Sequence, residues 1–300
     1  MREIDPITLQ VIGGALHAIA EQMGNVLYRM SYSSIIRESQ DLGAGLFDTD
    51  FNTLCESDST PMHIGSLPGY LRGIATRIPL SEWKPGDCVI HNHPYYGASH
   101  SPDIAIVMPV FFEGELVGFS ANTAHHVDIG TATPGLIIDV PDMFAEGMLM
   151  HSLKLYEEGV RNETLWRYIA DNTRVPALVM GDLEAQIASA ELGVKRFEEL
   201  FHKYGKAEVQ AACNQLMDYT ERMLRAEIAK IILETGDVSA PPTDSDIADV
   251  PPQSWFSGYA TEALTRQMFA LVAGRFLPGK PVTRGEMCHA IVRFMESADG

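Results

Sequence analysis

The spacing of hydrophobic residues predicts a long helix at the start of the chain. Asp5 is suited to cap a helix, and Pro6 is suited to its first position. Apolar residues then recur on about one face of a 3.6-residue period, at Ile7, Val11, Ala15, Ile19, Met23, Leu27 and Met30. We therefore expect a core helix that buries this face.

Two more long helices are predicted in the second half of the chain. Gly181 and Asp182 are expected to begin the first of them, and Tyr204 with Gly205 to end it. Its inward face is expected to be Leu183, Ile187, Ala190, Val194, Phe197 and Phe201. The next helix is expected from about Val209 to near Gly236, and both are interpreted as packing elements.

Short stretches between the first and second long helices predict strands. They occupy positions 43–48, 53–56, 88–91, 104–112 and 116–124. The last two are separated by Glu113 and Gly114 and form a β-hairpin. Before the strand at 88–91, a short helix is expected to turn Leu67, Leu71, Ile74 and Ile78 inward. Long packed helices with a mixed β-sheet core predict an α+β fold.

The composition of the chain changes near residue 239. Ser239 to Pro252 is rich in proline and acidic residues, which is typical of a linker. We therefore predict a main domain at 1–238, a linker at 239–252 and a small helical module at 253–300. The module is expected to begin with an aromatic-led helix, and Thr283 with Glu286 forms a capping box for its last helix.

Composition and charge narrow the class of protein. Three hundred residues with 46% apolar content can bury a substantial core, so an enzyme-sized globular protein is expected. The net charge of −18 argues against nucleic-acid or anionic-membrane partners, because those require clustered Lys and Arg. The four cysteines lie far apart without a CxxC pair and are interpreted as reduced thiols. The N-terminal segment resembles neither a signal peptide nor a spanning helix, which predicts a cytoplasmic protein.

The hairpin brings two histidines and a carboxylate together. With a two-residue loop, antiparallel pairing sets His125 opposite Pro102, and with a loop one residue longer it sets His125 opposite Asp103. In either register His125 lies within a residue of Asp103, and His100 lies on the irregular loop just before them. We therefore expect these three side chains to converge.

Such a set of nitrogen and oxygen donors suits a divalent metal such as Zn, Mn, Fe or Co. Three protein ligands also leave positions open for water or substrate. The alternative is that these residues cap the ends of the hairpin and hydrogen-bond the loop. The convergence of three such residues favours a metal site.

Several ordered motifs carry a family resemblance over about residues 5–235. They are ESQDLGAGLFD at 38–48, PMHIG at 61–65, GDCVIHNHPYYGASHSPD at 86–103, AHHVDIG at 124–130, DNTRVP at 171–176 and GDLEAQIA at 181–188. With these motifs the chain resembles the hydantoinase B/oxoprolinase family. Its members are partner subunits of ATP-dependent hydantoinases, 5-oxoprolinases and caprolactamase, and the acetone and acetophenone carboxylases are related.

This resemblance implies a set of site residues. The family's metal ligands fall on Asp41, His100, Asp103 and His125. His126, Asp128 and His93 would then orient the metal-bound imidazoles or act as a general base. At His93 the chain departs from the family, because it has Asn-His-Pro-Tyr where the family usually has Asn-Asp-Pro-Tyr.

The resemblance also implies an activity, namely ATP-dependent opening of a cyclic amide such as a hydantoin, 5-oxoproline or a lactam. A hydantoinase A-type partner subunit would use ATP and Mg to activate the amide, and this chain would complete the hydrolysis within a hetero-oligomer. The sequence contains no GxxxxGK phosphate-binding loop, which agrees with ATP being bound by the partner. Within the family, the alternative is ATP-dependent carboxylation of a ketone of the acetone or acetophenone type.

A second resemblance concerns residues 249–295. Trp255, the Gly274-Arg275-Phe276 run and Pro278 are similar to an S-layer homology repeat, a module that docks on bacterial cell walls. This implies a different hypothesis, a wall-associated structural protein with a vestigial metal site. A single repeat lacks the avidity of linked modules, so the enzyme interpretation is favoured.

Overall fold

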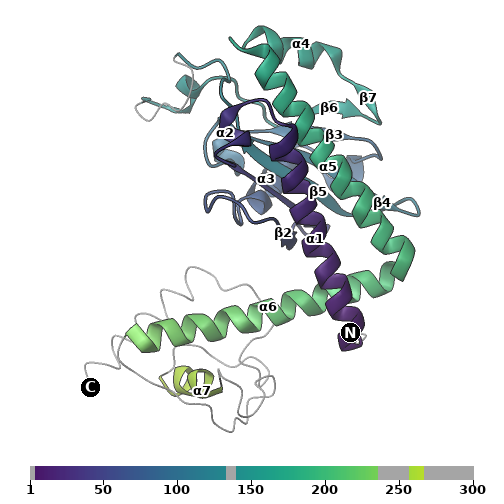
Figure 1. Cartoon of the computed structure of the whole chain (residues 1–300), viewed down its shortest axis with the longest axis vertical. Helices are drawn as coiled ribbons and strands as arrows, with labels where there is room; N and C mark the ends of the chain where they lie inside the picture. Colours follow the sequence, from purple (N-terminus) through teal and green to yellow (C-terminus); the bar gives the residue numbers. More distant parts are fainter. Residues whose placement is uncertain (1–3, 133–139, 236–256, 267–300) are drawn as a thin grey trace. The chain divides into compact units, whose positions relative to one another are not determined.

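Seven strands form one sheet in the order β2-β1-β5-β4-β3-β6-β7 (Figure 1). They are β1 Leu42–Phe47, β2 Thr53–Glu56, β3 Cys88–His91, β4 Asp103–Phe112, β5 Glu115–His125, β6 Leu153–Glu157 and β7 Val160–Arg161. Every neighbouring pair in this sheet is antiparallel. The computed structural model describes residues 4–132, 140–235 and 257–266. It divides into two compact units, Ile4–Gln210 and a second of residues 1–3 and 211–300, and the sheet belongs to the first.

Seven α-helices accompany the sheet in the described part of the chain, and the predicted α+β class is confirmed. They are α1 Pro6–Met30, α2 Ser34–Arg37, α3 Leu67–Ala75, α4 Glu163–Asp171, α5 Pro176–Tyr204, α6 Lys206–Thr235 and α7 Ser257–Thr265. Short 3-10 helices are η1 Leu80–Glu82, η2 Pro94–Tyr96 and η3 Met143–Glu146. Helix α4 and strands β6 and β7 were not predicted from the sequence.

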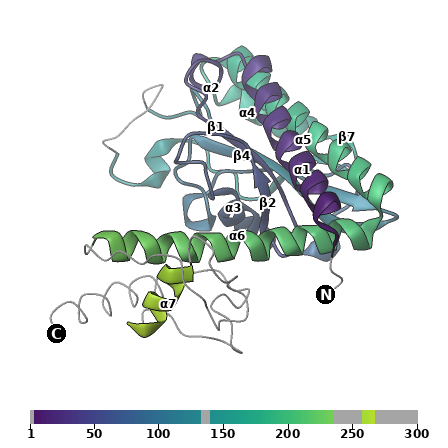
Figure 2. The same cartoon turned by 60° about the horizontal axis from the view of Figure 1, so that its bottom comes forward.

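Helices cover both faces of the sheet in the first unit (Figures 1 and 2). Along β4, Ile104 and Ile106 point into the core that includes α4 and α5. Ala105 and Val107 point to the opposite core, which α3 completes. This alternation follows from the two-residue period of a strand. A strand buried on both faces carries few polar residues, and in β4 the one charged residue is Asp103, at its start.

The buried face of α1 differs from the prediction. Ile7 is 77% exposed, Val11 47% and Met30 51%, so their assignment to the core was wrong. The face that packs inward is Ile12, Leu16, Ile19, Ala20, Met23 and Leu27. The helix carries two overlapping apolar stripes, and periodicity alone does not tell which one meets the sheet and α5.

The predicted start of the second long helix was also wrong. Helix α5 begins at Pro176, and Asp182 lies inside it, buried. The Asp182 carboxylate accepts hydrogen bonds from the backbone amides of Tyr32, at 2.7 Å, and Ser33, at 3.1 Å. A Cβ atom at Gly181 would lie 2.4 Å from the Tyr32 ring, so glycine permits this close approach. The Gly-Asp pair therefore joins α5 to the segment before α2 and does not begin a helix.

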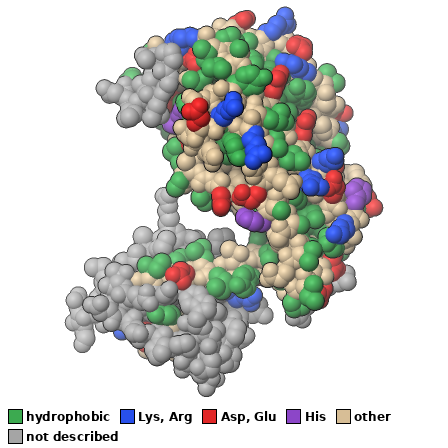
Figure 3. Space-filling model, in the orientation of Figure 1, with side chains coloured by type: hydrophobic (Ala, Val, Ile, Leu, Met, Phe, Trp, Pro, Cys, Tyr) green, Lys and Arg blue, Asp and Glu red, His purple; other side chains and the backbone are tan. Residues whose placement is uncertain are grey.

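The C-terminal predictions fall largely outside the described residues. Helix α6 ends at Thr235, close to the predicted end near Gly236, and α7 lies near the start of the module predicted at 253–300, where an aromatic-led helix is expected. The predicted linker at 239–252 and most of the module at 253–300 lie outside the described residues. Among the described helices, none is both long enough and apolar enough to cross a membrane. In the view of Figure 3, acidic and basic side chains of the described residues are interspersed with apolar ones.

Candidate metal centre

A β-bulge in the central hairpin sets the register of the candidate site. The turn at Glu113 and Gly114 has two residues, both with positive φ, so Phe112 pairs with Glu115. The register then shifts because Val117 is an extra residue on β5. As a result, His125 pairs with Asp103 and not with Pro102. The prediction attributed this register to a longer loop, but the bulge produces it.

The donor atoms of His100, Asp103 and His125 form a tight triangle. Asp103 Oδ1 lies 2.8 Å from His100 Nε2 and 3.0 Å from His125 Nδ1, and the two nitrogens are 3.1 Å apart. Ligand atoms that bind one ion at about 2.1 Å and at right angles lie roughly 3.0 Å apart. The three residues therefore fit three adjacent positions around a divalent metal ion. Among the described residues, they form the cluster of His, Cys, Asp or Glu side chains whose donor atoms lie close enough together to hold a metal ion.

Burial and charge make this cluster attractive to a cation. Burial raises the pKa of Asp103, but hydrogen bonds from His100 and His125 outweigh it and hold the pKa well below its usual range. Burial lowers the pKa of His100, but the hydrogen bond and charge of Asp103, with the charges of Glu146 and Asp41, outweigh it and raise the pKa. An ionised carboxylate between two imidazoles thus attracts either a proton or a metal ion.

Asp41 lies beside the triangle and is held by other partners. Its Oδ2 is 4.0 Å from His125 Nδ1. Its Oδ1 lies 3.0 Å from His63 Nε2 and accepts a hydrogen bond of 3.1 Å from the Thr60 hydroxyl. The backbone carbonyl of Asp41 also accepts the His125 amide at 3.0 Å. Asp41 is therefore next to the triangle but outside the set of mutually close donor atoms.

A shell of hydrogen bonds fixes the loop that carries His100. Ser99 Oγ donates to Asp103 Oδ2. Tyr70, on α3, donates from its hydroxyl to the Asp103 carbonyl at 3.3 Å and accepts the Ser99 amide at 3.4 Å. The Glu146 carboxylate, in η3, accepts the Ser101 amide at 3.0 Å. The irregular loop is thus tied to α3 and η3, which limits the positions open to His100.

The remaining predicted site residues have different surroundings. His126 is buried, and its Nε2 lies 2.8 Å from Gln186 Oε1, on α5. Burial lowers the pKa of His126 although the Gln186 hydrogen bond opposes it. Asp128 accepts hydrogen bonds from Gly130, Thr173 and Arg174. Its role in the structure is to hold the segment before α5.

His93 packs among aromatic rings. Its ring centre lies 4.9 Å from that of Tyr96, 5.1 Å from that of His151 and 6.2 Å from that of Tyr95. The structure thus brings His100, Asp103 and His125 together, with Asp41 beside them, and places His126, Asp128 and His93 in three separate environments.

Two polar residues near the site were not singled out from the sequence. His63 positions Asp41, and Gln186 connects His126 to the sheet by donating to the Ile104 carbonyl at 2.8 Å. Both stand in motifs that carry the family resemblance, PMHIG and GDLEAQIA. Their pairing depends on contacts between residues 22 and 60 positions apart, which spacing along the chain does not reveal.

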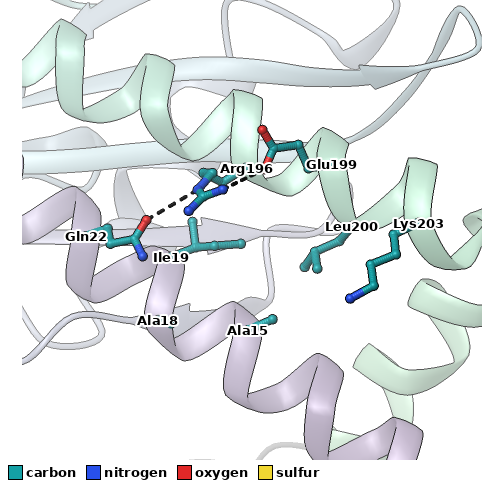
Figure 4. Close-up of a pocket in the computed structure, with 8 residues that line it drawn as sticks. All are labelled: Ala15, Ala18, Ile19, Gln22, Arg196, Glu199, Leu200 and Lys203. Carbon is teal, nitrogen blue, oxygen red and sulfur yellow. Dashed lines mark hydrogen bonds and ion pairs between the residues drawn. The ribbon is translucent and has the colours of Figure 1, made fainter.

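A hollow of about 260 Å³ lies between α1 and α5, and it does not involve the predicted site (Figure 4). Arg196 spans it, because its guanidinium lies 3.4 Å from Gln22 Oε1 and 2.8 Å from Glu199 Oε2. The other residues that line the hollow are Ala15, Ala18, Ile19, Leu200 and Lys203. The lining contains no set of metal ligands, and its lysine has no acid or base beside it other than Glu199, so we assign no chemistry to the hollow.

Comparison with known proteins identifies relatives of the chain. Residues 5–246 match the family model described as hydantoinase B/oxoprolinase. The B-type subunit of a putative D-/L-hydantoinase of Pseudomonas sp. (strain NS671) is 49% identical over 236 residues, which are 77% of this chain and 40% of that protein. The beta subunit of the caprolactamase of Pseudomonas jessenii is 34% identical over 227 residues, or 75% of this chain and 39% of that protein.

Solved structures agree on the fold. The ATP-dependent caprolactamase of Pseudomonas jessenii superposes with a TM-score of 0.71 at 27% identity, covering 90% of this chain and 52% of that one. An acetone carboxylase superposes with a TM-score of 0.66 at 18% identity, covering 84% and 34%. In sequence, the chain spans about two fifths of the length of the hydantoinase and caprolactamase subunits. The family match ends before residues 249–295, where the similarity to an S-layer homology repeat stays a prediction.

Proposed function

Because the chain belongs to the hydantoinase B/oxoprolinase family, we propose that it supplies the metal site of a complex that opens a cyclic amide ring with ATP. The substrate would be a hydantoin, 5-oxoproline or a lactam. The observation that carries this proposal is the triangle of His100, Asp103 and His125. The names of the relatives, hydantoinase, 5-oxoprolinase and caprolactamase, support the substrate class.

In this proposal the residues of the chain hold one ion of Zn, Mn, Fe or Co. His100, Asp103 and His125 would be ligands, with Asp41 as a fourth that moves inward from 4.0 Å. When bound, the ion would polarise the activated amide and lower the pKa of a water molecule. Asp103 contributes the negative charge, and His63 holds Asp41 at the rim of the site.

The other predicted residues have supporting roles in the proposal. His126 would receive its orientation from Gln186, whose amide oxygen accepts a hydrogen bond from the ring N–H at Nε2. That bond leaves Nδ1 as the acceptor end of a neutral imidazole, so His126 remains our candidate for a general base. Asp128 would stabilise the segment that ends with Arg174. His93 packs against His151, and among the described residues it has no hydrogen bond to His100 or His125, so we propose no orienting role for it.

A partner subunit completes the proposed complex. The sequence has no GxxxxGK loop, and the relatives include the B-type subunit of a hydantoinase and the beta subunit of a caprolactamase. We therefore propose a hetero-oligomer in which ATP and Mg are held by a hydantoinase A-type partner, which phosphorylates the amide oxygen. The chain alone is then expected to show no ATPase activity.

The first test is the metal content of the purified chain by mass spectrometry. Wild type should carry at least one transition-metal ion that both His100→Ala and Asp103→Ala lose. His17→Ala, at an exposed position on α1, is the matched control and should keep it. Wild type without metal after growth with supplied Zn, Mn, Fe and Co would count against the site.

The second test is activity after reconstitution with an ATP-using partner. A panel of cyclic amides should be opened in an ATP-dependent manner by wild type and by His17→Ala, but not by Asp103→Ala. Acetophenone with labelled bicarbonate forms the parallel arm. Incorporation of label without ring opening of any amide would replace this proposal with the ketone carboxylase alternative.

A further inference from the structure

A second group of histidines shares no residue with the triangle of His100, Asp103 and His125. His91 ends β3, His93 precedes η2, and His151 precedes β6. Their ring centres are 5.3 Å apart for His91 and His151, and 5.1 Å apart for His93 and His151. Helix α3 presses η2 into this group, because a Cβ atom at Gly73 would lie 1.6 Å from the Tyr96 carbonyl oxygen.

Two buried nitrogens in this group have no hydrogen-bond partner among the described residues. They are His93 Nδ1 and His151 Nε2. A buried polar atom without a partner costs roughly 1–3 kcal/mol, so native structures usually satisfy such atoms with water, an ion or a ligand. Two of them on adjacent rings indicate that one bound species serves both.

The arrangement of these two rings matches that of the candidate metal centre. The His93 and His151 rings are 5.1 Å apart and inclined by 53°. The His100 and His125 rings are 4.9 Å apart and inclined by 57°. Two imidazoles bound to one ion at about 2.1 Å, with tetrahedral angles, have ring centres roughly 5 Å apart. The ring-centre distance of the pair therefore matches that of two imidazoles bound to one ion.

The surroundings leave one nitrogen of the His151 ring without a partner. Desolvation by burial, with the nearby charges of Arg77 and His93, lowers the pKa of His151. Nε2 of His151 is buried and has no partner, and the nearby Gly73 backbone partly opposes the lowering of the ring's pKa. A lowered pKa favours the neutral imidazole, which is the form that binds a metal ion.

His91 has a different part in this group. Its Nε2 lies 3.1 Å from the Tyr96 carbonyl oxygen, and its Nδ1 lies 3.4 Å from the Ser152 hydroxyl. Burial lowers the pKa of His91 to about 4, so it adds no positive charge beside the pair. With both nitrogens occupied, His91 supports the other two rings and is not a ligand.

We propose that His93 and His151 form a second binding site, for one transition-metal ion. Its two nitrogen ligands suit Zn, Co, Ni or Cu and disfavour Mg and Ca, which require oxygen ligands. The guanidinium of Arg77 donates to the His151 carbonyl at 3.3 Å. This positive neighbour weakens cation binding and favours hydroxide or another anion at the open positions of the ion. The site is therefore weaker than the triangle, which contains a carboxylate.

The test is a titration of the metal-free full chain with Co²⁺, with ions counted by native mass spectrometry and d–d absorption. Wild type should bind two ions, the second more weakly than the first. His93→Ala and His151→Ala should each bind one, with the affinity for the second ion lowered at least about tenfold. His100→Ala should lose the other ion and keep this one. His17→Ala should bind two.

A second variant and a thermal unfolding measurement distinguish loss of the ion from loss of the fold. His93→Asn keeps a polar side chain of similar size, and thermal unfolding should show that it folds while it still lacks the second ion. Wild type that binds one ion, which only His100→Ala removes, would overturn this inference, because a water molecule then serves both nitrogens. That outcome would leave the proposed function intact. Wild type that binds one ion, which His93→Ala or His151→Ala removes but His100→Ala does not, would instead contradict the proposed function.

Discussion

Gln186 should be among the residues whose replacement costs most stability without creating a cavity. Its side-chain oxygen lies 2.8 Å from His126 Nε2, and its nitrogen donates to the Ile104 carbonyl at 2.8 Å and to Asn122 Oδ1 at 3.0 Å. All of these groups are buried. Gln186→Met keeps the unbranched shape of the side chain but removes all three hydrogen bonds at once.

The expected magnitude follows from the three partners left behind. Each buried donor or acceptor without a partner costs about 1–3 kcal/mol, and neighbouring terms do not add fully. Part of the loss is offset because Met is apolar and packs well. We therefore expect Gln186→Met to lower the free energy of unfolding by about 3–5 kcal/mol, a large share of the ~5–15 kcal/mol of a typical domain.

Urea denaturation followed by tryptophan fluorescence measures this loss, because Trp83 and Trp166 are buried in the same unit as Gln186. Gln22→Met is the matched control. Gln22 lies on α1, where its side chain accepts an exposed 3.4 Å hydrogen bond from Arg196, so its replacement should change stability by less than about 0.5 kcal/mol. A loss below about 1 kcal/mol for Gln186→Met, with an unchanged m-value, would refute the assigned network.

Two other predictions concern the support of the candidate centre. His63→Ala removes the 3.0 Å contact that holds Asp41. Metal affinity, measured by competition with a chelator, should then fall about 10–100-fold. Equal affinity in His63→Ala and His17→Ala would contradict a role for Asp41 as a ligand. Burial, with the charge of Asp103, raises the pKa of Tyr70 to about 12 from 10.0. The unfolded chain then loses a proton that the folded chain keeps, so stability should fall by up to about 3 kcal/mol as pH rises from 10 to 12, and Tyr70→Phe should lack this component of the alkaline loss.

Local patterns account for the parts of the fold that the sequence predicted correctly. The strands β2 and β3 begin and end as predicted, because turn residues bound them and strand pairing needs only the local period. The inward residues of α3 are those of its apolar stripe. The hairpin follows from a two-residue turn, and antiparallel return is enough to bring His125 within one residue of Asp103.

Contacts between distant segments account for the errors. The N-terminal helix has two apolar stripes, and packing against α5 decides which of them is buried. In one such contact the Ser189 hydroxyl donates to the Met23 carbonyl, 166 positions away in the sequence. Aspartate often caps a helix, but Asp182 instead accepts hydrogen bonds from the backbone amides of Tyr32 and Ser33. A propensity describes a residue with its neighbours in the chain, whereas burial depends on what the fold brings against it.

For the candidate site, the sequence by itself determined which donor types converge, because His100, Asp103 and His125 belong to one hairpin and its adjoining loop. Only the tertiary structure decided the bulge at Val117 that sets their register. It also decided the contact of His63 with Asp41, and the pairing of His93 with His151 across separate segments. The physical reason is that a hairpin is specified by its turn and its two-residue period. Contacts between distant segments form only when the whole sheet assembles and the helices pack on it.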